Sequence, residues 1–251
     1  MDKLKFTSKG LGILVVVSAG LALVPAGNST FPNPVPCSQP QGVCPDLIVD
    51  PAKMLDNNVQ TSTFSASNCE VEHGQAVPGV NKLLRFYYSQ VNVGDGDLLV
   101  GNPAQHPEWF VYNSCHGHYH FREYADYRLW TIQGYIDYAQ IRHANPDWTA
   151  EDTFANHPEL LSEFVAGNKQ GFCVIDLFPY SVNPSHFFSC GFQGITHGWA
   201  DEYVSGLSGQ WVNINGVASD VYMLEAETNS EHLFTESDYT NNSAAVPVLV
   251  L

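Results

Sequence analysis

The chain has 251 residues, of which 44% are hydrophobic, 12% aromatic and only 14% charged, a composition typical of a globular protein with enough apolar material for one large domain. Its formal net charge is −16 at pH 7, which excludes the phosphate backbone of a nucleic acid as a natural partner. The same charge would attract amines or basic proteins, although a merely solvated acidic surface explains it equally well.

The N-terminus has the order of a secretory signal peptide. Lys3, Lys5 and Lys9 precede an uncharged apolar run over 11–24, and small residues end that run at 25–27. An uncleaved membrane anchor is the alternative, but the run is shorter than the roughly 20 residues that a spanning helix needs. We therefore expect residues 1–26 to be removed. The remaining chain is then secreted, extracellular or at the cell surface, without membrane attachment.

Residues 27–45 are rich in Pro, Ser, Asn and Gly, and they predict an irregular N-terminal arm that a bridge between Cys37 and Cys44 would close. The chain has six cysteines, an even number that predicts disulfides in an exported protein. None of them forms a C-x-x-C pair, which argues against a zinc ribbon or a thioredoxin-like site.

From residue 46 onward, short runs of β-branched, aromatic and leucine residues are punctuated by Gly, Asn, Pro and Asp. This spacing predicts a mainly β fold, a single β-sandwich-like domain over 46–251 with long loops and little helix. The predicted strands centre on residues 47–49, 83–88, 98–100, 109–112, 127–130, 211–214 and 246–251.

Residues 134–166 differ from the rest because their apolar positions have a weak helical spacing. The segments that begin at Thr149 and at Pro158 could each start a short helix. We interpret 134–166 as an insertion that lies over the sandwich.

The clearest chemical signal is the alternation of His116, His118 and His120. Alternate side chains of a strand share one face, so this spacing points three imidazoles the same way. The first and third would be about 13 Å apart on an ideal strand, and a twist or bulge at Gly117 would let them reach one ion. Three neutral nitrogens suit Cu(II), Zn(II) or another late transition metal. The alternative is a set of ordinary surface or packing histidines.

The histidine segment is also one of six short segments that resemble the catalytic domain of the lysyl oxidase family, and they occur in the family's order. They are P-D-L-I-V-D-P at 45–51, L-L-R-F at 83–86, S-C-H-G-H-Y-H at 114–120, K-Q-G-F-C at 169–173, Q-G-I through D-E-Y at 193–203, and E-S-D-Y-T-N-N at 236–242.

The resemblance implies that the three histidines hold copper (Cu²⁺). It also implies that the ring of Tyr203 is oxidised and joined to the amine of Lys169, giving a lysine tyrosylquinone cofactor. The implied reaction is oxidative deamination of a primary amine by dioxygen to an aldehyde, hydrogen peroxide and ammonia. The amine would be peptidyl-lysine of a basic protein or a small primary amine. A general base is also needed, for which His186, Asp201 and His197 are candidates by their proximity in sequence.

The chain departs from vertebrate-type members in its cysteines and in its insertion. The resemblance implies a bridge between Cys115 and Cys190, which leaves Cys69 to pair with Cys173 as a hypothesis. The stretch before Lys169 is longer than in vertebrate-type members, and we predict that it shapes the entrance of the site and alters the choice of amine.

Two other functions remain open at this stage. A secreted copper-binding module without turnover would have no use for Lys169 and Tyr203 as a pair. A zinc hydrolase would need a general base near an open coordination position, and Glu123 or Asp126 near the histidines could serve.

Overall fold

The computed structural model describes residues 34–37, 43–122, 124–169, 172–181 and 186–251, with the side chains of Asn168 and Lys169 outside the description. The predicted signal peptide therefore lies outside the described residues. None of the described helices is long and apolar enough to cross a membrane.

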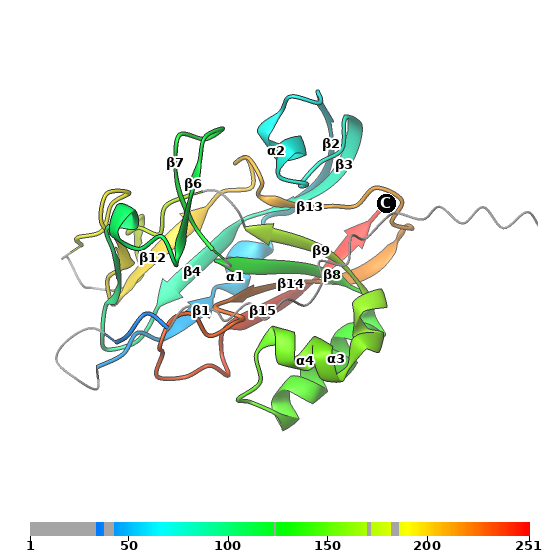
Figure 1. Ribbon diagram of the computed structural model, residues 1–251. Helices are drawn as coiled ribbons and strands as arrows, with labels where there is room; N and C mark the ends of the chain where they lie inside the picture. Colours follow the sequence, from blue (N-terminus) through cyan, green and yellow to red (C-terminus); the bar gives the residue numbers. More distant parts are fainter. Residues whose placement is uncertain (1–33, 38–42, 123, 170–171, 182–185) are drawn as a thin grey trace, which may run out of the picture. The chain divides into compact units, whose positions relative to one another are not determined.

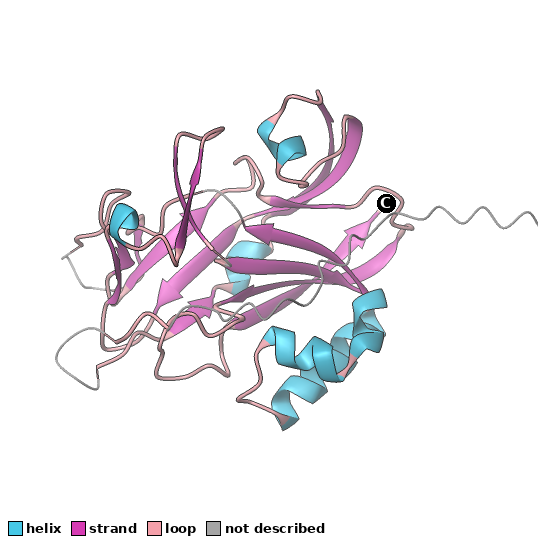
Figure 2. Cartoon of the chain, in the orientation of Figure 1, coloured by secondary structure: helices cyan, strands magenta, loops and turns pink. Residues whose placement is uncertain are grey.

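The fold is mainly β, as predicted, and its strands form several antiparallel sheets with few helices (Figures 1 and 2). One four-stranded sheet has the order β1 (Leu47–Val49), β4 (Tyr88–Asn92), β12 (Trp199–Tyr203), β10 (Phe178–Pro179). The other has the order β15 (Ser243–Val250), β14 (Asp220–Thr228), β8 (Ala125–Trp130), β9 (Phe164–Lys169).

Three smaller sheets complete the strands. They are β13 (Trp211–Asn213) with β3 (Gly79–Phe86) and β2 (Asn57–Phe64), β11 (Gln193–Ile195) with β5 (Leu98–Gly101), and the hairpin of β6 (Phe110–Asn113) and β7 (His118–Phe121). The short helices outside the insertion are α1 (Pro51–Met54), α2 (Cys69–Glu72) and the 3₁₀ turn η1 (Pro103–Gln105).

The sheet of β8 and β14 has a different environment on each face, because successive residues of a strand point to opposite sides. Tyr127 and Leu129 of β8 point into the main hydrophobic core, which also includes Tyr203. Trp130 points the other way into a second, smaller cluster with Tyr138 and Leu160.

The predicted insertion covers this second face. It forms α3 (Ile132–Ala144), α4 (Ala150–Asn156) and the 3₁₀ turn η2 (Pro158–Ser162), and Figure 1 shows α3 and α4 beside β8, β14 and β15. The predicted helix start at Thr149 is confirmed, since its side chain and that of Asp152 form a capping box. The insertion packs on the face opposite the core that holds Tyr203, so its effect on the choice of amine stays a prediction.

Three disulfides join the six cysteines, and only one has the predicted partners. Cys37–Cys44 is confirmed. The other two predicted pairs are wrong, because Cys115 pairs with Cys69 and Cys190 pairs with Cys173. The Cα atoms of these pairs are 5.9 and 5.1 Å apart, within the range that a disulfide spans. The bridge at Cys115 therefore ties the histidine segment to α2, and the other bridge closes the segment that follows β9.

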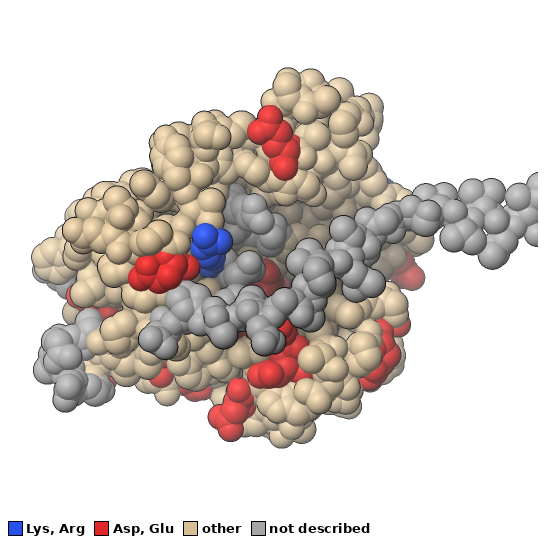
Figure 3. All heavy atoms as spheres, viewed as in Figure 1, with Lys and Arg blue, Asp and Glu red and all other residues tan. Residues whose placement is uncertain are grey.

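Acidic side chains predominate over basic ones on the face shown in Figure 3, in keeping with the net charge of −16.

Candidate metal centre and buried tyrosine

The three histidines lie at the closed end of the β6–β7 hairpin. His118 and His120 belong to β7, and they pair with Asn113 and Val111 of β6. His116 lies in the turn before β7, where Gly117 has a φ of 74°, a value that favours glycine. A turn, and not the predicted twist or bulge of one strand, therefore brings His116 back toward His120.

The side chain of Asn113 organises this turn. Its Oδ1 accepts hydrogen bonds from the backbone N–H groups of Cys115 (2.9 Å) and His116 (3.0 Å). Because these two bonds fix the orientation of the amide, Nδ2 is left to face the imidazoles, 3.4 Å from Nδ1 of His120. Asn113, the last residue of β6, thus holds the turn of the histidine segment closed.

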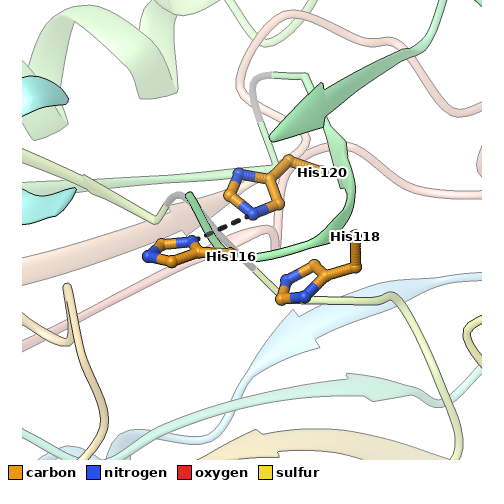
Figure 4. Close-up of side chains that lie close together, drawn as sticks. All are labelled: His116, His118 and His120. Carbon is orange, nitrogen blue, oxygen red and sulfur yellow. Dashed lines mark hydrogen bonds between the residues drawn. The ribbon is translucent and has the colours of Figure 1, made fainter. Parts of the chain in front are cut away.

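The imidazoles converge as the alternation predicts. One nitrogen from each of His116, His118 and His120 can be chosen so that all three lie within 4.8 Å of one another, and Figure 4 shows the rings gathered around a shared space. Nδ1 of His116 and Nε2 of His120 are hydrogen-bonded at 3.2 Å. His120 is buried and the other two are half-buried. This donor set fits a late transition metal ion, copper and zinc included.

A fourth histidine, which the sequence reasoning missed, lies beside the cluster. His73 follows α2, and its ring centroid is 5.3 Å from that of His116. Nδ2 of Asn113 donates to its Nε2 at 2.9 Å. No short-range spacing could have revealed His73, because it lies more than 40 residues before His116 in sequence and reaches the hairpin through the packing of α2, which the Cys69–Cys115 bridge ties to the hairpin.

Tyr203 lies deep in the protein on β12, with 2% of its surface exposed. Its hydroxyl is 2.5 Å from Oδ2 of Asp201 and 3.0 Å from the backbone oxygen of Cys173. Tyr124 donates to the same Oδ2 at 2.6 Å. Burial, followed by the negative charge of Asp201, raises the pKa of Tyr203 well above its ordinary value. The phenol is therefore held protonated with its proton directed at a buried carboxylate.

One aromatic ring lies between this tyrosine and the histidines. The centroid of Phe172 is 5.5 Å from that of Tyr203 and 6.2 Å from that of His118. The fold thus brings Tyr203 and the histidine cluster, more than 80 residues apart in sequence, against the same side chain.

The backbone of Lys169 ends β9 and pairs with Ala125, the neighbour of Tyr124. Its side chain lies outside the described part of the chain, so the predicted link to Tyr203 is a matter for experiment.

Of the three candidate bases, the structure places Asp201 at the hydroxyl of Tyr203. His186 packs against the ring of Trp199, with centroids 4.7 Å apart, and Nδ1 of the half-exposed His197 is 2.9 Å from Oδ1 of Asp97. The sequence offered no reason to prefer Asp201 beyond its spacing of two residues from Tyr203.

The structure gives little support to Glu123 or Asp126 as the general base of a zinc hydrolase. Glu123 lies outside the described residues. Asp126 accepts from Arg128 at 2.9 Å and from Ser230 at 2.7 Å. It also lines a cavity of about 310 Å³ together with His73 and Trp211, which gives that cavity one carboxylate beside the fourth histidine.

Comparison with known proteins agrees with these features. A sequence model of the lysyl oxidase family matches residues 49–145 and 143–249. Human protein-lysine 6-oxidase is 28% identical over 211 residues, which cover 79% of this chain and 44% of that protein. Human lysyl oxidase homolog 1 is 27% identical over 215 residues, 79% of this chain and 32% of that protein.

Lysyl oxidase homolog 2B of Danio rerio is 27% identical over 231 residues, which cover 87% of this chain and 26% of that protein. The chain thus spans less than half the length of these three relatives. Because the family model covers most of the chain, including the histidine hairpin and Tyr203, the chain belongs to the lysyl oxidase family.

Proposed function

We propose that this chain is a secreted copper-dependent amine oxidase. It oxidises a primary amine to an aldehyde; dioxygen is reduced to hydrogen peroxide, and water is consumed as ammonia is released. The observation that carries the proposal is the contact of one ring, Phe172, with both a three-histidine cluster and a buried tyrosine. A protein that only bound copper would have no need of a buried, hydrogen-bonded tyrosine beside its metal site.

In this proposal His116, His118 and His120 hold copper, and Tyr203 and Lys169 are the precursors of a lysine tyrosylquinone. The bound groups would supply an electrophilic carbonyl for the amine and a sink for two electrons, which no ordinary side chain provides. The chain's own residues then have to position the ring, exclude water and accept protons.

Asp201 is the residue best placed to accept a proton. It is completely buried, and its Oδ2 is the acceptor for both Tyr203 and Tyr124. A general base must lie within hydrogen-bond reach of the proton that it removes, and Asp201 meets that condition for the hydroxyl of Tyr203. Tyr124 supplies a second hydrogen bond, which keeps the carboxylate in place while Tyr203 reacts.

The negative net charge of the protein supports the proposal of a cationic substrate. The net charge of −16 attracts amines over a long range. The cavity beside His73 adds the carboxylate of Asp126 and the aromatic ring of Trp211, a combination that suits an ammonium group. We propose peptidyl-lysine of a basic protein, the substrate named for the human relative, or a small primary amine.

The decisive experiment is peptide mass spectrometry on protein that has been loaded with copper in air. We expect the peptide that contains Lys169 to be covalently joined to the one that contains Tyr203, and the Tyr203→Phe variant to lack this species. If both peptides are free and unmodified while copper is fully bound, the chain is a copper-binding module without turnover.

A further inference from the structure

The fourth histidine, His73, is a part of the metal centre to which the proposed function gives no role. It directly follows α2, and its ring centroid lies 5.3 Å from that of His116 and 6.4 Å from that of His120. Among the described residues, the nitrogens that lie within 4.8 Å of one another come from His116, His118 and His120 alone. His73 is thus close to the cluster without belonging to it.

The side chain of Asn113 joins His73 to the cluster, and the acceptor of the amide determines its orientation. Oδ1 accepts from the backbone N–H groups of Cys115 (2.9 Å) and His116 (3.0 Å). An amide nitrogen donates and does not accept, so Nδ2 directs its hydrogens at other groups. It donates to Nε2 of His73 at 2.9 Å, and Nδ1 of His120 lies 3.4 Å away. One amide therefore contacts His73, the turn and the ring of His120.

The bond to Asn113 also fixes the tautomer of His73. Because Asn113 donates, Nε2 is the unprotonated nitrogen of the imidazole. Nδ1 then carries the proton, and it is buried without an acceptor among the described residues. In this arrangement neither nitrogen is open to a metal ion, since the lone pair of Nε2 is occupied by Asn113 and Nδ1 is protonated and enclosed.

α2 holds His73 against the hairpin. The backbone N–H of His73 donates to the oxygen of Cys69 at 2.9 Å. Cys69 is bridged to Cys115, whose own N–H donates to Asn113. These contacts close a ring that runs from Cys69 through His73 and Asn113 to Cys115. The turn that carries His116 is therefore held from α2 as well as from β6.

We propose that His73 is a positioning residue of the metal centre and acts through its acceptor nitrogen, not as a ligand. It keeps the amide of Asn113 in the orientation that binds the N–H groups of the turn. Without this acceptor, Nδ2 would retain the long contact with His120 alone, and the amide could rotate and release His116. Residues that orient metal ligands in this way raise metal affinity.

The inference rests on the copper-binding part of the proposed function and does not require amine oxidation. A copper titration of the full chain against a competing chelator tests it with three substitutions. His73→Gln retains an acceptor, because its amide oxygen can replace Nε2, whereas a neutral amide is a poor ligand for Cu(II). His73→Leu has no acceptor. His143→Leu makes the same change at an exposed histidine of α3 and is the control.

We expect copper affinity to fall about ten- to a hundredfold in His73→Leu, the loss typical of residues that orient metal ligands. His73→Gln and His143→Leu should bind copper nearly as tightly as the parent chain. Electron paramagnetic resonance of bound Cu(II) should show the same number of coordinated nitrogens in His73→Gln as in the parent, and an altered hyperfine splitting in His73→Leu.

Circular dichroism of the copper-free variants separates this effect from a loss of the fold. His73→Ala, which lacks the acceptor and the bulk, replaces His73→Leu if that variant does not fold. Equal losses of affinity in His73→Gln and His73→Leu, with one coordinated nitrogen fewer, would make His73 a ligand and overturn the proposal. Unchanged affinity in His73→Leu would overturn it as well.

The same titration distinguishes this inference from the proposed function. A parent chain that binds no copper would overturn both the metal centre and the role of His73. A parent chain that binds copper, loses affinity in His73→Leu and regains it in His73→Gln would support the inference even if Lys169 and Tyr203 were never joined. In that case only the oxidase reaction would be rejected.

Discussion

The hairpin that carries the histidines and the strand that carries Tyr203 meet at Phe172, yet they are held in place differently. The hairpin is a two-stranded sheet with exposed side chains at Val111 and Tyr112, and it is tied down by a disulfide and the amide of Asn113. The β12 strand pairs with β4 and β10 inside a four-stranded sheet, and its tyrosine is almost completely buried.

This difference separates two tasks. A metal ion needs an accessible site with ligands of the right geometry, which a short hairpin with one turn provides. A tyrosine that is to be modified needs a fixed orientation, a proton acceptor and protection from water, and these require neighbours from several parts of the chain. We therefore expect changes in the hairpin and changes around Tyr203 to affect different measurements.

Tyr203→Phe should have the largest effect. Without the phenol no quinone can form, so amine oxidation should fall by about a thousandfold or more, while copper content stays the same. Activity by peroxide release, quinone by redox staining and copper by mass spectrometry check this. Tyr112→Phe, at an exposed tyrosine of the hairpin, is the matched control. A quinone signal that survived in Tyr203→Phe would assign the cofactor to another residue.

Removal of the Cys69–Cys115 bridge should come next. The bridge closes a loop with a sequence separation of 46, so replacing both cysteines by serine should lower the free energy of unfolding by about 4 kcal/mol. It should also weaken copper binding, because α2 and His73 are no longer held at the hairpin. Denaturant unfolding and a copper titration measure both effects.

The Cys173–Cys190 bridge is the control for that experiment. Its two cysteines have a sequence separation of 17, so replacing both by serine should lower the free energy of unfolding by about 3 kcal/mol. Copper affinity should be retained. Equal loss of copper affinity in the two double variants would contradict the separation of tasks.

His120→Ala should weaken copper binding by about a hundredfold or more, since loss even of a residue that only supports a metal ligand costs up to about that much. The surroundings of Tyr203 should persist, because its hydroxyl is hydrogen-bonded to Asp201 and to the backbone oxygen of Cys173, which both lie outside the hairpin. Competition with a chelator gives the affinity, and near-ultraviolet circular dichroism reports the aromatic core. His143→Ala, at an exposed histidine of α3, should leave copper affinity unaltered.

Asp201→Asn should slow quinone formation by about a hundredfold, the lower end of what a positioned base contributes. Asn has nearly the same volume, and its oxygen can still accept from Tyr203, so copper affinity should not change. The rate is followed by quinone absorbance after copper is added in air. Asp97→Asn, at the carboxylate paired with His197, is the control. An unaltered rate in Asp201→Asn would rule out its role as proton acceptor.

Glu231→Gln, outside both regions, should have the smallest effect on copper binding and activity, and change stability alone. Burial, with Asp126 and Glu151 nearby, raises the pKa of Glu231 to about 7. The folded state therefore binds this proton more tightly than the unfolded state does, and stability is lost as pH rises from the unfolded pKa to the folded one. The variant should be more stable than the parent by up to about 3 kcal/mol at pH 8 and equally stable at pH 4. A constant difference across that range would mean that Glu231 is ionised in the fold.

The local features of the molecule were predictable because they depend on neighbours in sequence. Runs of β-forming residues indicated the mainly β fold, and Thr149 indicated the start of α4. The alternation of His116, His118 and His120 indicated convergent imidazoles. The six ordered segments indicated the lysyl oxidase family, to which the chain belongs. Each of these signals lies within a few residues, where backbone geometry alone sets which side chains share a face or a cap.

Only the tertiary structure decided the relations between distant parts. Six cysteines allow fifteen pairings, and the position of α2 beside the hairpin determined that Cys115 joins Cys69. The same packing brought His73 to the cluster, placed Asp201 rather than His186 or His197 at the hydroxyl of Tyr203, and put the insertion on the sheet face away from it. Long-range contacts of this kind depend on how whole sheets pack, and no spacing within the sequence encodes them.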